Sequence, residues 1–287
     1  MKPASFEYVR PGSLPEALDA LARHAATGKI LAGGQSLVPM MNLRIVKPGV
    51  LIDINRVPGL AEIRVDGAEL VVGALARHAA LAESALVAKH CPLMAEAYPW
   101  VAHGPIRNRG TLGGNISHAD PASEMPAVLA TCDAKIVVQS ATGSRSIGAS
   151  AFFTGPLSTA LAAGEMVTEI RIPVARTGEG SSWLEISNRQ GDFAMAGVGV
   201  VLSVVGGKCE RVSIGVAGMA NPGTRLPTVE RQLVGQMLDD AAIASAARAA
   251  RDAIQPSDSY HADAAFKREL VETLTTRALT AARGRAN

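Results

Sequence analysis

Apolar residues recur at helical spacing from Leu14 to Ala25, directly after a Ser13-Leu-Pro-Glu16 segment typical of a helix start. Two short apolar runs, 29–32 and 50–54, predict buried strands, and the segment 37–44 between them predicts a helix. A strand, a loop, a helix and a second strand in this order favour parallel pairing of the two strands.

From Ile63 onward the pattern changes to shorter segments. Residues 63–65 and 70–72 flank Asp66-Gly67, a sequence typical of a β-hairpin. The remaining pattern of this half predicts helices over 81–90 and 92–102, and strands over 134–139, 146–147 and 166–172.

A segment rich in turn residues, 173–180, indicates a linker and a domain boundary. Beyond it the pattern predicts three strands, over 183–189, 195–205 and 209–217, with Gly206-Gly207 joining the last two as a hairpin. The alanine-rich remainder from Val229 predicts helices, and the tail after Ala281 is expected to fray.

The pattern therefore predicts an α+β fold in two parts. The first covers 1–176 as two subdomains of about 1–56 and 57–176, and the second covers 177–287 as a three-stranded antiparallel sheet with helices. A chain of 287 residues with 48% hydrophobic residues is long and apolar enough for both.

Composition argues against several kinds of partner. An aromatic content of 3% leaves little material for stacking on nucleic-acid bases. The net charge is +2 and both signs are interspersed, so no patch suits a polyanion or a membrane surface. The N-terminus has no apolar leader, and no apolar run approaches the about 20 residues of a membrane span. We therefore expect a cytoplasmic protein.

The three cysteines, Cys91, Cys132 and Cys209, lie far apart in the sequence and form no Cys-x-x-Cys pair. This argues against an iron–sulfur cluster or structural zinc carried wholly by this chain, and against a disulfide framework. The histidines match no metal-ligand spacing, so we expect no metal site. Free thiols fit a reducing compartment.

A first glycine loop, Ala32-Gly-Gly-Gln-Ser-Leu37, follows the first predicted strand. Adjacent glycines allow a close approach of the backbone to a bulky anion, and the backbone N–H groups near a helix start favour a phosphate. Lys29 lies just upstream, but neither the dinucleotide fingerprint nor the P-loop pattern is present. Spacing alone leaves a ligand-binding loop and a tight strand-to-helix turn as equal alternatives.

A second glycine loop, Thr111-Leu-Gly-Gly-Asn-Ile116, lies about eighty residues later. The residues after it, Ser117, Asp120 and Glu124, add hydroxyl and carboxylate groups suited to a ribityl chain, a ribose or a diphosphate. The alternative is an exposed turn followed by a helix over 124–130 that Ser123 caps. Two such loops together suggest one extended ligand held from both sides.

The pairing of Ala-Gly-Gly-Gln-Ser-Leu with Ile106-Arg-Asn-Arg-Gly-Thr-Leu-Gly-Gly-Asn-Ile-Ser-His-Ala-Asp-Pro121 resembles the FAD-binding medium subunit of molybdenum hydroxylases. The carbon monoxide dehydrogenase and xanthine dehydrogenase types belong to this family. The resemblance covers essentially the whole chain, including 164–173 and 191–194. It implies an FAD-binding domain of the vanillyl-alcohol-oxidase/PCMH type, with two subdomains, followed by a three-stranded antiparallel sheet with a helical bundle.

The resemblance also implies the cofactor contacts. The FAD diphosphate would lie on the first loop, Ala32, Gly33, Gly34, Gln35, Ser36 and Leu37, with Lys29 beside it. The opposite side of the cofactor would contact the second loop and the residues after it: Thr111, Gly113, Gly114, Asn115, Ser117 and Asp120. Val101, Ala102 and Val167 correspond to apolar positions near the cofactor, and Phe193 to a residue that approaches the isoalloxazine ring. A core position in a strand is the alternative for Phe193.

Two positions depart from the family pattern. Glu124 stands where several relatives have aspartate, and its longer carboxylate would still accept a hydrogen bond from the cofactor. Around Leu184-Glu185 some relatives place a lysine that reaches the cofactor, and this chain has none. Any electrostatic stabilisation of the reduced flavin must come from elsewhere.

The implied function is electron transfer without a catalytic acid, base or nucleophile in this chain. Electrons would come from the [2Fe–2S] clusters of a small partner subunit, and the substrate would be oxidised at the molybdenum cofactor of a large one, commonly in a dimer of heterotrimers. A stand-alone FAD-dependent oxidase and a simple flavin-binding module are the alternatives. Carbon monoxide, a purine, a nicotine-like heterocycle and an aldehyde all remain open as the substrate.

Overall fold

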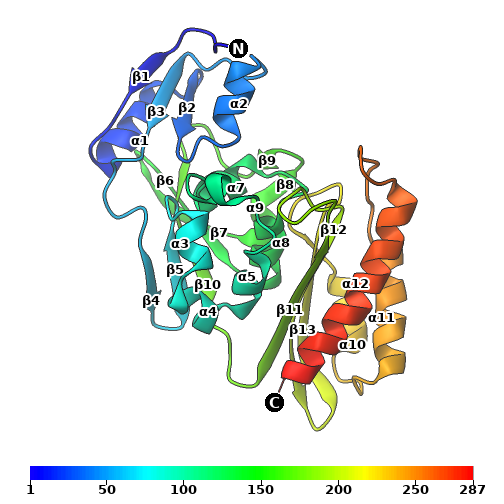
Figure 1. Cartoon of the computed structure of the whole chain (residues 1–287). Helices are drawn as coiled ribbons and strands as arrows, with labels where there is room; N and C mark the ends of the chain where they lie inside the picture. Colours follow the sequence, from blue (N-terminus) through cyan, green and yellow to red (C-terminus); the bar gives the residue numbers. More distant parts are fainter. Residues whose placement is uncertain (287) are drawn as a thin grey trace.

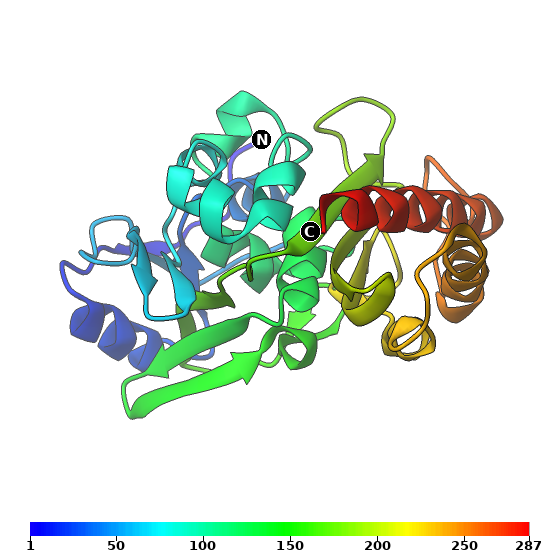
Figure 2. The same ribbon diagram turned by 90° about the horizontal axis from the view of Figure 1, so that it is seen from below.

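The computed structural model describes residues 1–286. Figure 1 shows an N-terminal lobe, a central body, and a C-terminal sheet with long helices along one side. The view from below in Figure 2 shows these helices, α11 and α12, side by side at the edge of the molecule. None of the described helices is long and apolar enough to cross a membrane.

The N-terminal lobe is a small parallel sheet with two helices. Its elements are β1 (Glu7–Val9), α1 (Leu14–Arg23), β2 (Gly28–Leu31), α2 (Leu37–Asn42) and β3 (Val50–Asp53). The strand order is β1-β3-β2, with both pairs parallel, so the predicted parallel pairing is confirmed. Ser13 Oγ accepts from the Glu16 N–H and caps α1 as predicted. The helix predicted over 37–44 ends earlier, because Arg44 turns into the left-handed region at φ 57°.

The central body is built on a five-stranded antiparallel sheet in the order β4-β5-β10-β6-β7. Its strands are β4 (Ile63–Asp66), β5 (Glu69–Gly73), β6 (Lys135–Ser140), β7 (Gly143–Gly148) and β10 (Met166–Pro173), and a small pair, β8 (Phe153–Gly155) and β9 (Ser158–Thr159), lies beside it. The predicted hairpin and strands of this half are present.

Short helices pack on this sheet: α3 (His78–Ala82), α4 (Ala85–His90), α5 (Pro92–Ala97), α6 (Gly104–Arg107), α7 (Leu112–His118), α8 (Glu124–Thr131) and α9 (Ala149–Phe152). The single helix predicted over 81–90 is wrong, since Ser84 starts a new helix by accepting from the Val87 N–H. The helix predicted over 92–102 also ends early, at Ala97, because Pro99 has no N–H group with which to continue it.

The C-terminal sheet is antiparallel, in the order β11-β12-β13-β14. The elements are β11 (Glu179–Ile186), β12 (Ala196–Val205), β13 (Lys208–Ala217), β14 (Thr224–Arg225), α10 (Pro227–Leu233), α11 (Asp240–Ala253) and α12 (Ala264–Arg285). The three predicted strands are present, and a two-residue strand is added at the β13 edge.

The end of α12 corrects one expectation. The tail after Ala281 does not fray, since α12 continues to Arg285. The Arg285 guanidinium donates to Ser181 O at 2.6 Å and to Glu96 Oε2 at 2.8 Å, which fastens the last turn to β11 and α5.

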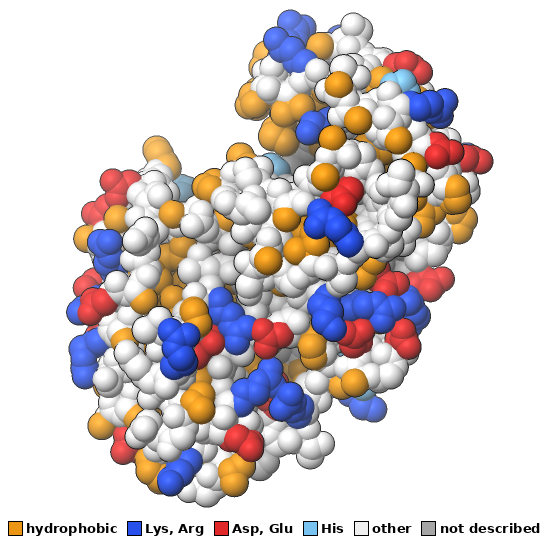
Figure 3. Space-filling model, turned by 180° about the vertical axis from the view of Figure 1, so that it is seen from behind, with side chains coloured by type: hydrophobic (Ala, Val, Ile, Leu, Met, Phe, Trp, Pro, Cys, Tyr) orange, Lys and Arg blue, Asp and Glu red, His pale blue; other side chains and the backbone are white. Residues whose placement is uncertain are grey.

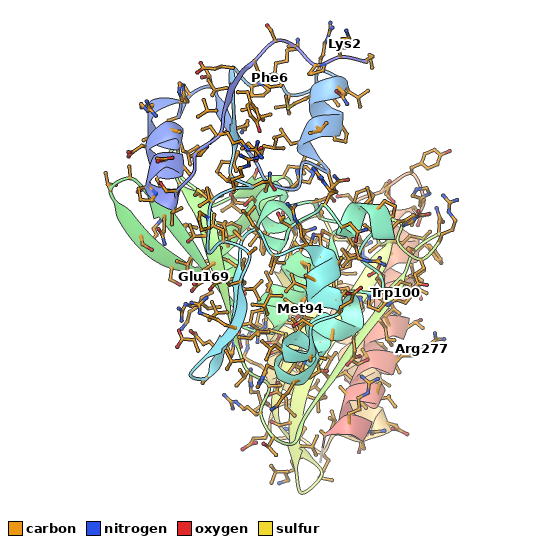
Figure 4. All side chains as sticks on the ribbon, turned by 60° about the vertical axis from the view of Figure 1, so that its left-hand side comes forward. Lys2, Phe6, Met94, Trp100, Glu169 and Arg277 are labelled. Carbon is orange, nitrogen blue, oxygen red and sulfur yellow. The ribbon has the colours of Figure 1, made fainter. Side chains whose placement is uncertain are left out.

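The helix α8 lies at the centre of the molecule, and all of its residues are buried. It packs on β12 and β13 as well as on α5 and α7. A Cβ on Gly215 of β13 would lie 2.8 Å from Ala127 O, so the contact between strand and helix is very close. The main core, to which Met94 of α5 belongs (Figure 4), also takes in Trp183 and Val201. Residues 174–178 connect β10 to β11 at the predicted boundary, but apolar packing continues across it.

Candidate functional site

The fold brings the two glycine loops together. The first loop lies between β2 and α2, and the second begins α7. A Cβ on Gly33 would collide with Arg109 O and lie 2.7 Å from Gly110 Cα, so this glycine lets the first loop touch the backbone that leads into the second. Figure 3 shows that the surface is hollowed between the N-terminal lobe and the rest of the molecule. The first loop and the segment that leads into the second loop are therefore in direct contact.

A chain of hydrogen bonds that no sequence pattern indicates joins the two loops. Asn55 Nδ2 donates to Ala32 O at 2.9 Å, and Arg77 Nη2 donates to Asn55 Oδ1 at 2.6 Å. The other guanidinium nitrogen, Arg77 Nη1, donates to Arg109 O. Arg77 therefore acts as a bridge between the first loop and the approach to the second, and it draws these two backbones together.

Asp53 fixes Asn55, the residue to which Arg77 donates. Its Oδ1 accepts from Asn55 N at 2.9 Å and from Asn55 Nδ2 at 2.6 Å, while the Tyr8 hydroxyl donates to Oδ2. Burial by itself raises the pKa of Asp53, but the hydrogen bonds from Tyr8 and Asn55 outweigh it and hold the pKa below its usual value. The carboxylate is therefore charged and fixes the orientation of Asn55.

The first loop presents a row of free donors. Within residues 1–286, no group accepts a hydrogen bond from the backbone N–H of any residue from 33 to 37. Gly34 adopts φ 74°, and Gln35 Nε2 donates to Gly33 O at 3.1 Å, which stabilises the turn. The Ser36 side chain precedes α2 without capping it. Consecutive unpaired backbone N–H groups are the kind of donor set that can bind an anion, and Lys29 is exposed on the preceding strand.

The second loop is held more tightly. Thr111 Oγ1 accepts from Gly114 N at 3.1 Å and caps α7. Asn115 and Ser123 exchange hydrogen bonds of 2.8 and 3.1 Å between their side chains. Gly113 is buried, and its N–H donates to Ala74 O at 2.9 Å, so it serves packing. Gly114 is exposed, as is Ser117 one turn later on α7, so both are available to a ligand.

Asp120 and Phe193 line a cavity of about 430 Å³, which Lys267 and His261 also border. The Asp120 Oδ1 accepts from Ala122 N at 2.9 Å, which turns the chain toward α8. Phe193 is 67% exposed on the connection from β11 to β12, so its alternative placement in a strand core is wrong. An exposed aromatic ring beside a cavity suits contact with another planar group.

The connection that carries Phe193 lies on the turn that contains Val101 and Ala102. Arg107 Nη1 donates to Val101 O at 3.0 Å and to Ala102 O at 2.6 Å, which supports the left-handed turn. A Cβ on Gly191 would overlap the His103 ring and lie 2.8 Å from Ala102 O. Val101 is buried under this contact. The C-terminal half therefore closes over one end of the site.

Two predicted contact residues lie in the interior instead of on the cleft surface. Val167 is 4% exposed in β10, within the main core. Glu124 is 5% exposed at the start of α8, and burial raises its pKa to about 7, with a smaller contribution from Asp120. Both are buried behind the second loop, so they pack beneath it and are not exposed to a ligand.

The position where some relatives carry a lysine holds a second buried acid. Glu185 is 3% exposed on β11, and its Oε2 accepts from Trp183 Nε1 at 3.2 Å. No group in the part of the chain that the structure describes pairs with its Oε1. Burial raises the pKa of Glu185 to about 9, and the nearby charge of Glu124 adds to the effect. This carboxyl is therefore neutral at pH 7.

The histidines are not gathered into a metal-binding cluster in the described part of the chain. Residues 1–286 contain no group of three or more His, Cys, Asp or Glu side chains that could hold a metal ion. His78 is 4% exposed and packs against Tyr98, with ring centroids 5.9 Å apart. Burial lowers the pKa of His78 to about 4, with help from the charge of Arg107, so the imidazole is neutral.

Comparison with known proteins identifies the family of this chain. Residues 4–175 match the family model "FAD binding domain in molybdopterin dehydrogenase", and residues 181–282 match "CO dehydrogenase flavoprotein C-terminal domain". The chain is similar to the 6-hydroxypseudooxynicotine dehydrogenase complex subunit alpha of Paenarthrobacter nicotinovorans, with 39% identity over 100% of this chain and 97% of the relative. It is also similar to the caffeine dehydrogenase subunit beta of a Pseudomonas species, with 36% identity over 99% and 97%.

The solved structures agree with the sequence comparison. Carbon monoxide dehydrogenase from Hydrogenophaga pseudoflava, in a form that lacks the Mo-pyranopterin moiety of the molybdenum cofactor, contains a chain that matches with a TM-score of 0.97 and 37% identity. The match covers 100% of both chains. The similarity therefore includes the C-terminal sheet and its helices as well as the part with the glycine loops.

Proposed function

Because this chain belongs to the family of FAD-binding medium subunits of carbon monoxide dehydrogenase-like molybdenum hydroxylases, we propose that it holds FAD across its two glycine loops and relays electrons. It is an oxidoreductase subunit with an FAD-binding domain. The observation that carries the proposal is the row of free backbone N–H groups from 33 to 37, directly beside the second loop.

The residues present fit the cofactor. The N–H groups of the first loop and the Ser36 hydroxyl would donate to the diphosphate, and Lys29 would add a positive charge nearby. On the opposite side, the exposed start of α7 at Gly114 and the Ser117 hydroxyl would face the cofactor. Phe193 and the cavity beside Asp120 would receive the isoalloxazine end.

In the proposed complex, FAD held by this chain would supply the electron-transfer chemistry between the [2Fe–2S] clusters of a small partner subunit and an external acceptor. The substrate would be oxidised in a large partner subunit that carries the molybdenum cofactor. This chain orients its cofactor, closes one end of the site with the loop that carries Phe193, and supplies no acid or base. The names of the relatives, which are subunits of dehydrogenase complexes, support such partners.

One pair of serine variants tests the binding site. Ser36→Ala removes a hydroxyl that has no protein partner in residues 1–286, so FAD affinity should fall by about tenfold or more while stability stays unchanged. Ser13→Ala is the matched control, because it removes the cap of α1 and should cost about 1 kcal/mol of stability without affecting FAD.

Titration of the full chain with FAD, followed by flavin fluorescence, and thermal unfolding measure the two effects. Equal FAD affinity in both variants and the wild type would show that the first loop does not hold the diphosphate.

The redox partners need a separate experiment. The chain, tagged and expressed in its native host, should co-purify with two further subunits and with iron and molybdenum. A stable flavin-containing monomer that oxidises a small substrate by itself would instead identify a stand-alone oxidase, and a flavin-containing monomer without activity would identify a simple binding module.

A further inference from the structure

Two of the three cysteines meet in the fold. The Cys91 and Cys132 Sγ atoms lie 3.8 Å apart, although 41 residues separate them in the sequence. Cys91 joins α4 to α5, and Cys132 directly follows the last turn of α8. Cys209 lies in the other core, with its Sγ 3.6 Å from Arg211 O. The distances therefore distinguish one close pair of thiols from a third, separate one.

The close pair borders a cavity and is open to a small reagent. Both cysteines line a cavity of about 230 Å³ on the side where β10 leads into β11. Cys132 is partly exposed, whereas Cys91 is 3% exposed. Arg211 borders the same cavity and pairs with Asp133 at 3.6 Å and with Glu179 at 3.4 Å. A molecule of the size of hydrogen peroxide fits this space.

The contact also gives the two sulfurs different roles. The hydrogen bond between the two thiols lowers the pKa of the Cys91 thiol and raises the pKa of the Cys132 thiol. Cys91 is therefore the sulfur that ionises first, and a thiolate is the form that attacks a peroxide. Cys132, 3.8 Å away, is then the resolving thiol, which attacks the oxidised Cys91 sulfur.

We propose that Cys91 and Cys132 form a reversible intramolecular disulfide when hydrogen peroxide oxidises this chain. The Cys91 sulfur attacks one peroxide oxygen and the O–O bond breaks, which gives a sulfenic acid on Cys91 and one molecule of water. The Cys132 sulfur then attacks the Cys91 sulfur, the S–S bond forms, and the hydroxyl leaves with the Cys132 proton as a second water. Two thiols lose two electrons, and the peroxide gains them. A dithiol reductant reverses the step.

The cross-link would enclose the segment from 91 to 132, which contains the whole second glycine loop. Closing a loop of this length restricts the unfolded chain, so oxidation should raise the unfolding temperature by several degrees. The sulfurs must approach from 3.8 Å to a bond length of about 2.05 Å. Both cysteines lie at helix ends, where a shift of this size needs no change inside a helix.

The test uses the full chain, hydrogen peroxide and mass spectrometry. After peroxide treatment and alkylation under denaturing conditions, the wild type should carry one alkyl group, on Cys209, and a peptide that links Cys91 to Cys132. Dithiothreitol should restore three alkylated thiols. Cys209→Ser is the matched control, and it should form the same cross-link.

Single variants test the order of the steps. Cys132→Ser should trap a sulfenic acid on Cys91 that a dimedone probe labels, whereas Cys91→Ser should leave Cys132 unlabelled. Three alkylated thiols in the oxidised wild type, or a cross-link through Cys209 or between two chains, would overturn the proposal. A sulfenic acid found on Cys132 would overturn the assigned roles.

Discussion

Glu185→Gln should change the stability of this protein in opposite directions at low and high pH. Glu185 is buried, its Oε2 accepts from Trp183 Nε1, and its pKa is raised from 4.5 to about 9. A carboxyl whose folded-state pKa lies above its unfolded value stabilises the fold fully below pH 4.5. That stability is lost as the pH rises toward 9.

The magnitude follows from the size of the shift. At pH 8 the wild type has lost about 4–5 kcal/mol through Glu185, at 1.36 kcal/mol per pH unit over roughly 3.5 units, and at pH 5 it has lost less than about 1 kcal/mol. Glutamine keeps the acceptor for Trp183 but buries an amide NH₂ group without a partner, which costs about 1–3 kcal/mol at every pH. The variant should therefore be more stable than the wild type by about 2–4 kcal/mol at pH 8, and up to about 2 kcal/mol less stable at pH 5.

Urea unfolding of the full chain between pH 5 and 8, followed by tryptophan fluorescence, measures this difference. His78, whose pKa is lowered from 6.5 to about 4, gains stability as the pH rises through that range, but it does so in both proteins and cancels. Glu165→Gln is the opposite control. The Arg145 guanidinium lowers the pKa of Glu165 to about 2, so the variant should lose stability at both pH values. A Glu185→Gln difference that is constant across pH would refute the reasoning.

Three further variants test the contacts around the site and the C-terminal helix. Arg77→Met removes the bridge to Asn55 and Arg109, so FAD affinity in a fluorescence titration should fall by about tenfold or more. The control Arg64→Met, on the outer edge of the sheet, should leave FAD affinity unchanged. Gly191→Ala should speed FAD dissociation in a stopped-flow experiment, because its Cβ would displace the loop from His103. Arg285→Ala should lower the unfolding free energy by about 1 kcal/mol in a urea titration, since it frees the end of α12 from Ser181 O.

Local patterns predicted most of the strands and both glycine loops. The strand–loop–helix order predicted the parallel lobe because handedness and connection length leave few alternatives. Gly206-Gly207 predicted the hairpin between β12 and β13 because both residues take positive φ. The boundaries of short helices were less predictable. Ser84 interrupts a run that remains helical in composition, and only the packing of the folded chain selects this break.

The interior of the site depends on contacts that no local pattern contains. Arg77 lies 22 residues from Asn55 and 32 from Arg109, and its side chain joins them only after the lobe and the body have packed together. Glu185 lies in β11 at a position that reads as part of a half-exposed strand, but α5 packs on β11 and Glu185 is buried. Cys91 and Cys132 lie 41 residues apart in the sequence, so no local pattern predicts their contact either. Burial and long-range pairing are properties of the tertiary structure.

The fully buried helix α8 has a consequence for how such subunits change over time. It contacts both the second glycine loop, through α7, and the C-terminal strands, with Gly215 pressed against Ala127 O. A substitution on any side of this helix meets a neighbour, because none of its faces is left to solvent. Recombining the first half of one relative with the second half of another would therefore produce mismatched cores. The two halves are expected to be inherited and to diverge together, as one unit of selection.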